Sequence, residues 1–137
     1  MKTLSDYLKR DSFIRAAPPP GARRRADLPG RIAGLEPFDL PGLVEHELTP
    51  GFALLHARVD EPGDLRVRVV LLGSPWTCGR LPPAHTVICV RVPAAASRAY
   101  LGFMARLSRM LLAPDAAAAF ESADVDRILE FIHAFER

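Results

Sequence analysis

Hydrophobic and polar residues alternate most regularly in the middle of the chain. Such alternation predicts β-strands, because successive side chains of a strand point to opposite faces of a sheet. Three strands are expected, over Phe52–Val59, Leu65–Leu72 and Thr86–Val92. The segment Glu61–Asp64, with a Pro-Gly pair at its centre, predicts a turn, and the proline-containing span Gly73–His85 predicts a loop.

After Pro93 the apolar positions recur every three or four residues, which predicts helices. Ser97 is the expected cap of the first of them. Its apolar stripe consists of Tyr100, Leu101, Phe103, Met104, Leu107, Met110 and Leu111. A short alanine-rich turn ends at Phe120, and Ser122 is expected to cap a last helix. The buried face of that helix is predicted to contain Val125, Ile128, Leu129, Ile132 and Phe135.

The first 48 residues have a less regular pattern. Ser5 is expected to cap a short helix through about Arg10. The segment Ala16–Gly21 holds three successive prolines and predicts a stiff, extended connector. Two short helices are predicted beyond it, over Leu28–Gly34 and Leu40–Leu48. Strands in the middle with helices on both sides in sequence predict a sheet that helices cover on at least one face.

Length and composition favour one cytoplasmic domain. A chain of 137 residues, 49% of them hydrophobic, is long enough to build one compact domain with a core. No apolar run approaches the roughly 20 residues that a membrane helix needs, and the first residues lack the apolar core of a signal peptide. We therefore expect a cytoplasmic protein without membrane insertion.

Charge and cysteine content exclude other classes of function. The formal net charge is +2, and the basic excess is confined to the first 34 residues. It is too small to indicate a nucleic-acid-binding protein, and the run Arg23–Arg25 is interpreted as a solvated surface. Cys78 and Cys89 lie outside any metal-ligand spacing, and the four histidines form no recognisable zinc set. Neither a metal site nor a disulfide framework is expected.

One histidine lies near the end of the first predicted strand. His56 shares a strand face with Arg58, which places the imidazole beside a guanidinium. With an unperturbed pKa of about 6.5, histidine keeps one ring nitrogen free to attack, and a nearby cation stabilises an incoming phosphoryl group. The same pattern fits a histidine that packs at a strand end and performs no chemistry. From the residues alone, both interpretations stay open.

Two longer motifs extend this pattern. The first is Gly51-Phe52-Ala53-Leu54-Leu55-His56-Ala57-Arg58. The second is Val92-Pro93-Ala94 followed by Ala99-Tyr100-Leu101-Gly102-Phe103-Met104-Ala105-Arg106-Leu107-Ser108-Arg109-Met110-Leu111. Together they resemble the IIA domain of the bacterial phosphoenolpyruvate-dependent phosphotransferase system, in its fructose, mannitol and nitrogen-regulatory class. Residues 49–135 follow this family in order and spacing, whereas residues 1–48 diverge as a shortened helical N-terminal part.

The resemblance implies a single α/β domain over residues 1–137, with a mixed β-sheet between helices. It also implies that His56 accepts a phosphoryl group from a histidine phosphocarrier protein. The group then passes to a IIB partner, or the phosphorylation state serves as a regulatory signal. No cofactor, metal ion or nucleic acid is implied, and a homodimer stays open. The expected surroundings of the phosphoryl group are Thr49, Gly51, Arg58, Ser97 and Tyr100.

The sequence departs from the family pattern in this pocket. Leu55 occupies the position of a proline, and Tyr100 occupies that of a second histidine, so a phenol replaces a group that can carry positive charge. The candidates to compensate are Arg58, Arg98 and His46, while His85 and His133 receive no role. Because the pocket is depleted, the alternative is a IIA-like regulatory or interaction module that is not phosphorylated. In either case Phe52, Leu54 and Tyr100 are expected to form an apolar rim for a partner.

Overall fold

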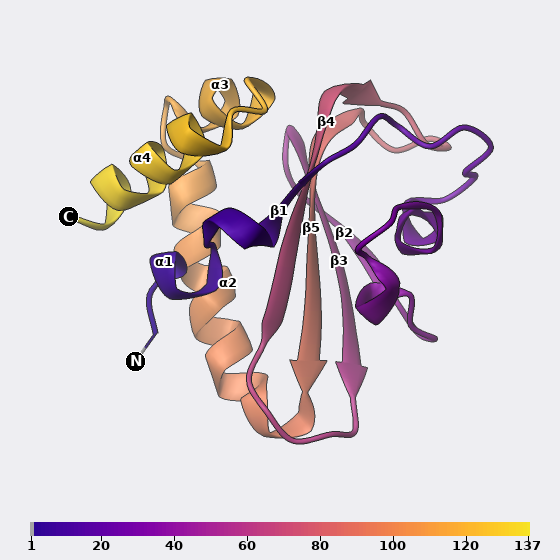
Figure 1. Ribbon diagram of the computed structural model, residues 1–137, viewed down its shortest axis with the longest axis horizontal. Helices are drawn as coiled ribbons and strands as arrows, with labels where there is room; N and C mark the ends of the chain where they lie inside the picture. Colours follow the sequence, from indigo (N-terminus) through magenta and orange to yellow (C-terminus); the bar gives the residue numbers. More distant parts are fainter. Residues whose placement is uncertain (1) are drawn as a thin grey trace.

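Five strands form one mixed sheet in the order β1-β4-β5-β3-β2, as seen in the computed structural model, which describes residues 2–137 (Figure 1). The strands are β1 Phe13–Arg15, β2 Val44–Thr49, β3 Gly51–Val59, β4 Arg66–Trp76 and β5 Ala84–Pro93. β1 is parallel to β4 and β3 is parallel to β5, whereas the pairs β4–β5 and β2–β3 are antiparallel. The predicted α/β fold with a mixed sheet is confirmed.

The three strands predicted from alternation are confirmed as β3, β4 and β5. β5 lies between the other two, and its residues are buried on both faces from Ala84 to Val90. The turn predicted over Glu61–Asp64 is present as a bend, but it connects strands that are not neighbours. β4 continues past Leu72 to Trp76 through an irregular register, so the connecting loop is shorter than predicted.

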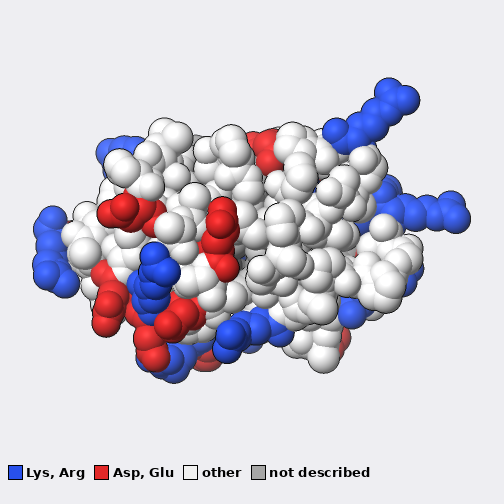
Figure 2. All heavy atoms as spheres, turned by 90° about the horizontal axis from the view of Figure 1, so that it is seen from above, with Lys and Arg blue, Asp and Glu red and all other residues white. Residues whose placement is uncertain are grey.

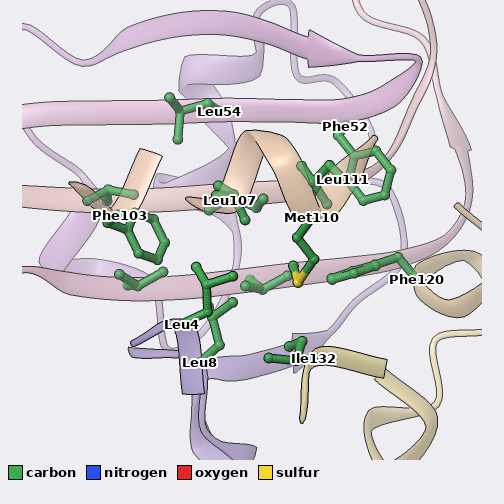
Figure 3. Packing of buried hydrophobic residues seen from close by; sticks show 14 of the residues in the cluster. Leu4, Leu8, Phe52, Leu54, Phe103, Leu107, Met110, Leu111, Phe120 and Ile132 are labelled. Carbon is green, nitrogen blue, oxygen red and sulfur yellow. The ribbon is translucent and has the colours of Figure 1, made fainter. Parts of the chain in front are cut away.

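Four helices cover one face of the sheet (Figure 1). They are α1 Leu4–Tyr7, α2 Ser97–Leu111, α3 Ala116–Glu121 and α4 Val125–Glu136. Their apolar side chains meet those of β3, β4 and β5 in one core, which removes their surface from water. Figure 3 shows part of this core: Leu4, Leu8, Phe52, Leu54, Phe103, Leu107, Met110, Leu111, Phe120 and Ile132.

The apolar stripe of α2 is narrower than predicted. Phe103, Leu107, Met110 and Leu111 are buried, whereas Leu101 is 68% exposed. In α4, Ile128 and Ile132 are buried as predicted, while Phe135 is 39% exposed near the end of the helix. Both helices thus contact the sheet along one line of side chains, as the helical period requires.

Short 3-10 helices and irregular chain cover the other face of the sheet. These helices are η2 Arg25–Arg31 and η3 Glu36–Phe38, while η1 Arg10–Ser12 and η4 Ala94–Ala96 connect other elements. Leu28, Leu35 and Phe38 pack here on a second core that the opposite faces of β3, β4 and β5 provide. The segment Ala16–Gly21 has no regular structure beyond a turn at its end, as its prolines predicted. The helix predicted over Leu28–Gly34 is therefore a 3-10 helix that begins and ends earlier.

The helix predicted over Leu40–Leu48 is wrong. Val44–Thr49 instead form β2, which pairs with β3 through the turn at Pro50. A local pattern of Glu and Leu is compatible with a helix, but hairpin pairing satisfies the backbone of this segment and covers the edge of β3. The turn requires Gly51, whose φ is +93°.

The predicted caps of the first and last helices are also wrong. At α1 the cap is Thr3, whose backbone N donates to Asp6 Oδ2 over 2.7 Å, whereas Ser5 binds Glu136. α1 ends at Tyr7 rather than near residue 10. At α4 the cap is Asp124, whose Oδ1 accepts from the backbone N of Asp126 over 3.1 Å. A carboxylate outcompetes the Ser122 hydroxyl because it accepts stronger hydrogen bonds from free helix N–H groups.

Arg25 corrects the interpretation of the arginine run as a solvated surface. Arg23 and Arg24 are exposed, but Arg25 is 1% exposed. Its guanidinium binds Glu47 of β2 and the carbonyl oxygen of Pro82. The three arginines are identical in sequence, and it is the start of η2 at Arg25 that directs the third side chain inward.

The surface carries charges of both signs. Figure 2 shows most acidic side chains of the upper face over the helical layer, mixed with basic ones, while single basic side chains project at the opposite end.

Among residues 2–137, no helix combines the length and the apolar character that a membrane span needs. Cys78 and Cys89 are free and buried, and burial raises the pKa of the Cys89 thiol to about 12.

Candidate functional site

The candidate site lies where the parallel strands β3 and β5 end and α2 begins. His56 is in the second half of β3, opposite Val44 of β2 and Val90 of β5. Its side chain points to the face that α2 covers, since Phe52 and Leu54 on the same face belong to the helical core. The carboxyl ends of parallel strands are the usual place for sites in α/β folds.

Two aromatic rings contact the imidazole of His56. The imidazole of His46, on β2, stacks on that of His56, with 5.0 Å between ring centroids and 7° between ring planes. The phenol of Tyr100, on α2, approaches from the helical layer, with its centroid 5.5 Å from that of His56 and a tilt of 34°. An edge strand, an inner strand and a helix therefore fix the orientation of one imidazole.

The surroundings of His56 favour the neutral form of its imidazole. Burial lowers its pKa from the ordinary value of 6.5, and positive charge on His46 and Arg58 acts in the same direction. Within residues 2–137, neither ring nitrogen of His56 has a hydrogen-bond partner. A neutral ring with a free nitrogen is the state in which histidine acts as a nucleophile.

Arg58 is the cation nearest to His56 on its own strand. It is exposed, and its Nη1 donates to Ser97 Oγ over 2.7 Å. Ser97 in turn donates to the carbonyl oxygen of Ala94 over 3.3 Å. The Ser97 hydroxyl therefore orients Arg58 and does not cap α2, which corrects the cap predicted there.

Two hollows meet at Arg58. The first, of about 260 Å³, is lined by Pro41, Gly42, Val44, His56, Ala57 and Arg58. β2 begins at Val44, opposite His56, while β3 continues to Val59, so this hollow lies beside the free edge of β3. The second, of about 380 Å³, is lined by Arg58, Val59, Asp60, Ala94 and Ser97. An anion in the first hollow would meet both the imidazole and the guanidinium.

Thr49 and Gly51 are not part of this site. They lie at the hairpin between β2 and β3, with Thr49 opposite Phe52. Phe52 and His56 are four positions apart along the strand, which corresponds to roughly 13 Å. Of the five residues expected around the phosphoryl group, the fold brings Arg58, Ser97 and Tyr100 to His56 and places Thr49 and Gly51 at the other end of β3.

At that other end, Gly51 lies against His85. His85 is 7% exposed, its Nδ1 is 2.7 Å from Thr86 Oγ1, and its Nε2 is 3.5 Å from Glu121 Oε1. Burial lowers the pKa of His85, and the carboxylate of Glu121 opposes that effect. This histidine packs against the hairpin at Gly51, and we assign it no chemical role.

The other candidates lie elsewhere. Arg98 lines a separate hollow of about 390 Å³ between α2 and the residues Lys2, Tyr7 and Asp64. His133 is exposed on α4. The expected apolar rim is wrong in two of its three members, because Phe52 is 0% and Leu54 2% exposed. The helical layer covers the strand face of these two residues. Of the three expected members of the rim, Tyr100 is the one that is half-buried at the site.

His46 is the residue whose place the sequence did not reveal. The helix predicted over Leu40–Leu48 places His46 on a helix, whereas it lies on β2, where its ring stacks on that of His56. The available signal was the alternation of Val44, His46 and Leu48 with two glutamates directly before a Pro-Gly turn, which is typical of a hairpin strand.

No protein-family model and no curated protein sequence matches this chain. The resemblance to IIA domains therefore depends on the two motifs quoted above, and the activity that it implies is a proposal.

Proposed function

We propose that this protein accepts a phosphoryl group on His56. The observation that carries the proposal is the hollow that the His56 imidazole shares with Arg58, at a ring whose surroundings lower its pKa and so favour the neutral form. Phosphoryl transfer between nitrogen atoms needs a positioned nucleophile and a cation for the developing charge, and little acid-base chemistry. Both requirements have a named residue at this site.

In the proposed step, a ring nitrogen of His56 attacks phosphorus and forms a P–N bond. The bond from phosphorus to the donor nitrogen breaks, and the leaving nitrogen keeps the electron pair. The proton on the other nitrogen of His56 passes to the leaving group or to water. Arg58, held by Ser97, stabilises the phosphoryl oxygens.

The resemblance supplies the rest of the proposal. The donor is a histidine phosphocarrier protein in the cytoplasm, and the recipient is a IIB partner or a regulatory target that distinguishes the phosphorylated form. The hydroxyl of Tyr100 is available as a hydrogen-bond donor where IIA domains have a second histidine. Burial raises the pKa of this phenol, which keeps it protonated at neutral pH.

A regulatory module that is not phosphorylated is the second candidate. It is favoured by the placement of Thr49 and Gly51 at the far end of β3, which leaves the phosphoryl group with fewer donors than the resemblance implies. It is also compatible with two exposed apolar side chains, Val44, which is opposite His56 on β2, and Leu101, which follows Tyr100 on α2. In that case His56 would be a packed histidine.

Intact-mass analysis tests the proposal. The protein is incubated with phosphoramidate, a small donor with a P–N bond, and separately with phosphoenolpyruvate, the first enzyme of the system and its phosphocarrier. We expect an acid-labile gain of one phosphoryl group that disappears in His56→Gln and persists in the matched control His133→Gln. No gain with active donors and folded protein would count against phosphotransfer and favour the second candidate.

A further inference from the structure

We infer that His46 is a positioning residue: its ring holds the His56 ring in place for attack, and its positive charge disfavours a proton on that ring. This inference rests on the proposed function of His56, because it concerns the conditions under which that residue reacts. It assigns a role to a second histidine that lies on a different strand from the nucleophile.

The geometry carries the first part of the inference. His46 is opposite Leu54 on β3, so it is the diagonal neighbour of His56 on the same face of the sheet. Diagonal neighbours are within reach of each other when both side chains are aromatic, and here the two rings are nearly parallel at 5.0 Å. Together with Tyr100, this contact restricts rotation of the His56 ring. Stacking occupies a ring face and leaves the nitrogen-bearing edge free for in-line attack.

The electrostatics of the cluster carry the second part. The groups that face His56 are His46 from β2, Arg58 from its own strand and Tyr100 from α2, while β5 contributes the apolar Val90. Water solvates the charged form of His46, because its side chain is exposed, whereas His56 is partly buried. A proton on His46 therefore makes a second proton on His56 costly.

Two consequences follow for the proposed reaction. A positive charge on His46 disfavours a proton on His56 and so preserves the nucleophilic form of His56. The imidazolium of His46 then adds a second positive charge beside Arg58, close to the transferred phosphoryl group. A residue of the edge strand β2 thereby supplies a positive charge that the phenol of Tyr100 cannot supply.

The test compares His46→Phe, which keeps an aromatic ring and removes the charge, with His46→Gln, which removes the ring. The phosphorylation rate with phosphoramidate is measured between pH 5 and 8, and each variant rate is divided by the wild-type rate at the same pH, which cancels the titration of the donor. Protonation of His56 is followed in parallel by NMR of its ring protons. His133→Phe, at an exposed position of α4, is the matched control.

We expect the rate ratio of His46→Phe to fall as the pH falls, because His56 protonates more readily without a charged neighbour. His46→Gln is expected to be slower at every pH, because the ring of His56 is less fixed. Rate ratios that do not depend on pH, together with an unchanged His56 titration, would overturn the inference. If the wild type is not phosphorylated, the proposed function fails, while the NMR titration still decides whether His46 controls the protonation of His56.

Discussion

The guanidinium of Arg25 is buried against the carboxylate of Glu47, with 2.8 Å between Arg25 Nη1 and Glu47 Oε2. Arg25 begins η2, whereas Glu47 lies on the edge strand β2. The same guanidinium donates to the carbonyl oxygen of Pro82, shortly before β5. One side chain thus joins the 3-10 layer to the edge strand β2 and to the loop that leads into β5.

Loss of the negative charge at Glu47 should destabilise the fold. Glu47→Gln leaves the Arg25 cation buried without a counter-charge, so we expect the free energy of unfolding to fall by about 3 kcal/mol. Urea denaturation followed by circular dichroism measures the change. The control is Arg24→Gln, which breaks the exposed pair with Asp27 and should have little effect. Equal losses in both variants would contradict the importance assigned to burial.

Gly51→Ala should weaken the hairpin that places β2 beside β3. A Cβ atom at this position would lie 2.4 Å from His85 Nε2, and the φ of +93° is unfavourable for alanine. We expect a loss of at least about 2 kcal/mol, from backbone strain together with the steric clash. Gly63→Ala is the matched control, since its φ is +123° and its Cβ would meet no described atom within 4 Å. A similar loss in both variants would mean that only the backbone conformation matters.

The two leucines Leu107 and Leu101 of α2 should respond differently to truncation. Leu107 is 0% exposed and Leu101 is 68% exposed. Leu107→Ala is expected to cost about 3 kcal/mol, because the core loses apolar contacts and keeps a cavity. Leu101→Ala is expected to leave the thermal midpoint nearly unchanged, as measured by differential scanning calorimetry. A larger loss of stability in Leu101→Ala than in Leu107→Ala would contradict the face of α2 that is described as packed on the sheet.

Stability should decrease as the pH is lowered from 7.5 to 5.5. Burial lowers the pKa values of both His56 and His85 below the ordinary value of 6.5. The unfolded chain therefore binds protons that the folded protein excludes, so their contribution to stability is present above 6.5 and is lost as the pH falls through the folded pKa values. The urea midpoint should be lower at pH 5.5, and His56→Gln should reduce the difference. A midpoint that rises on acidification would contradict the assigned sign.

Several elements were predictable because their signals are local. The alternation in residues 52–92 identifies β3, β4 and β5, and the helical period after Ser97 identifies α2 and α4. Helix ends were less predictable. At α4 the Asp124 carboxylate, and not Ser122, accepts from the free N–H groups, and at α1 the N–H groups of Leu4 and Ser5 donate to Glu136 of α4. Arg25 and its neighbours have the same chemistry, so their sequence alone cannot indicate which of them is buried.

The candidate site shows the same division. The sequence by itself determined that His56 and Arg58 share a strand face, because strand geometry fixes residues two apart on one side. It also placed Ser97 and Tyr100 at the start of a helix. Only the tertiary structure decided that Thr49 and Gly51 lie at the far end of β3 and that His46 stacks on His56. Those relations depend on the formation of β2 as a hairpin strand beside β3, in a segment whose local pattern of Glu and Leu is also compatible with a helix.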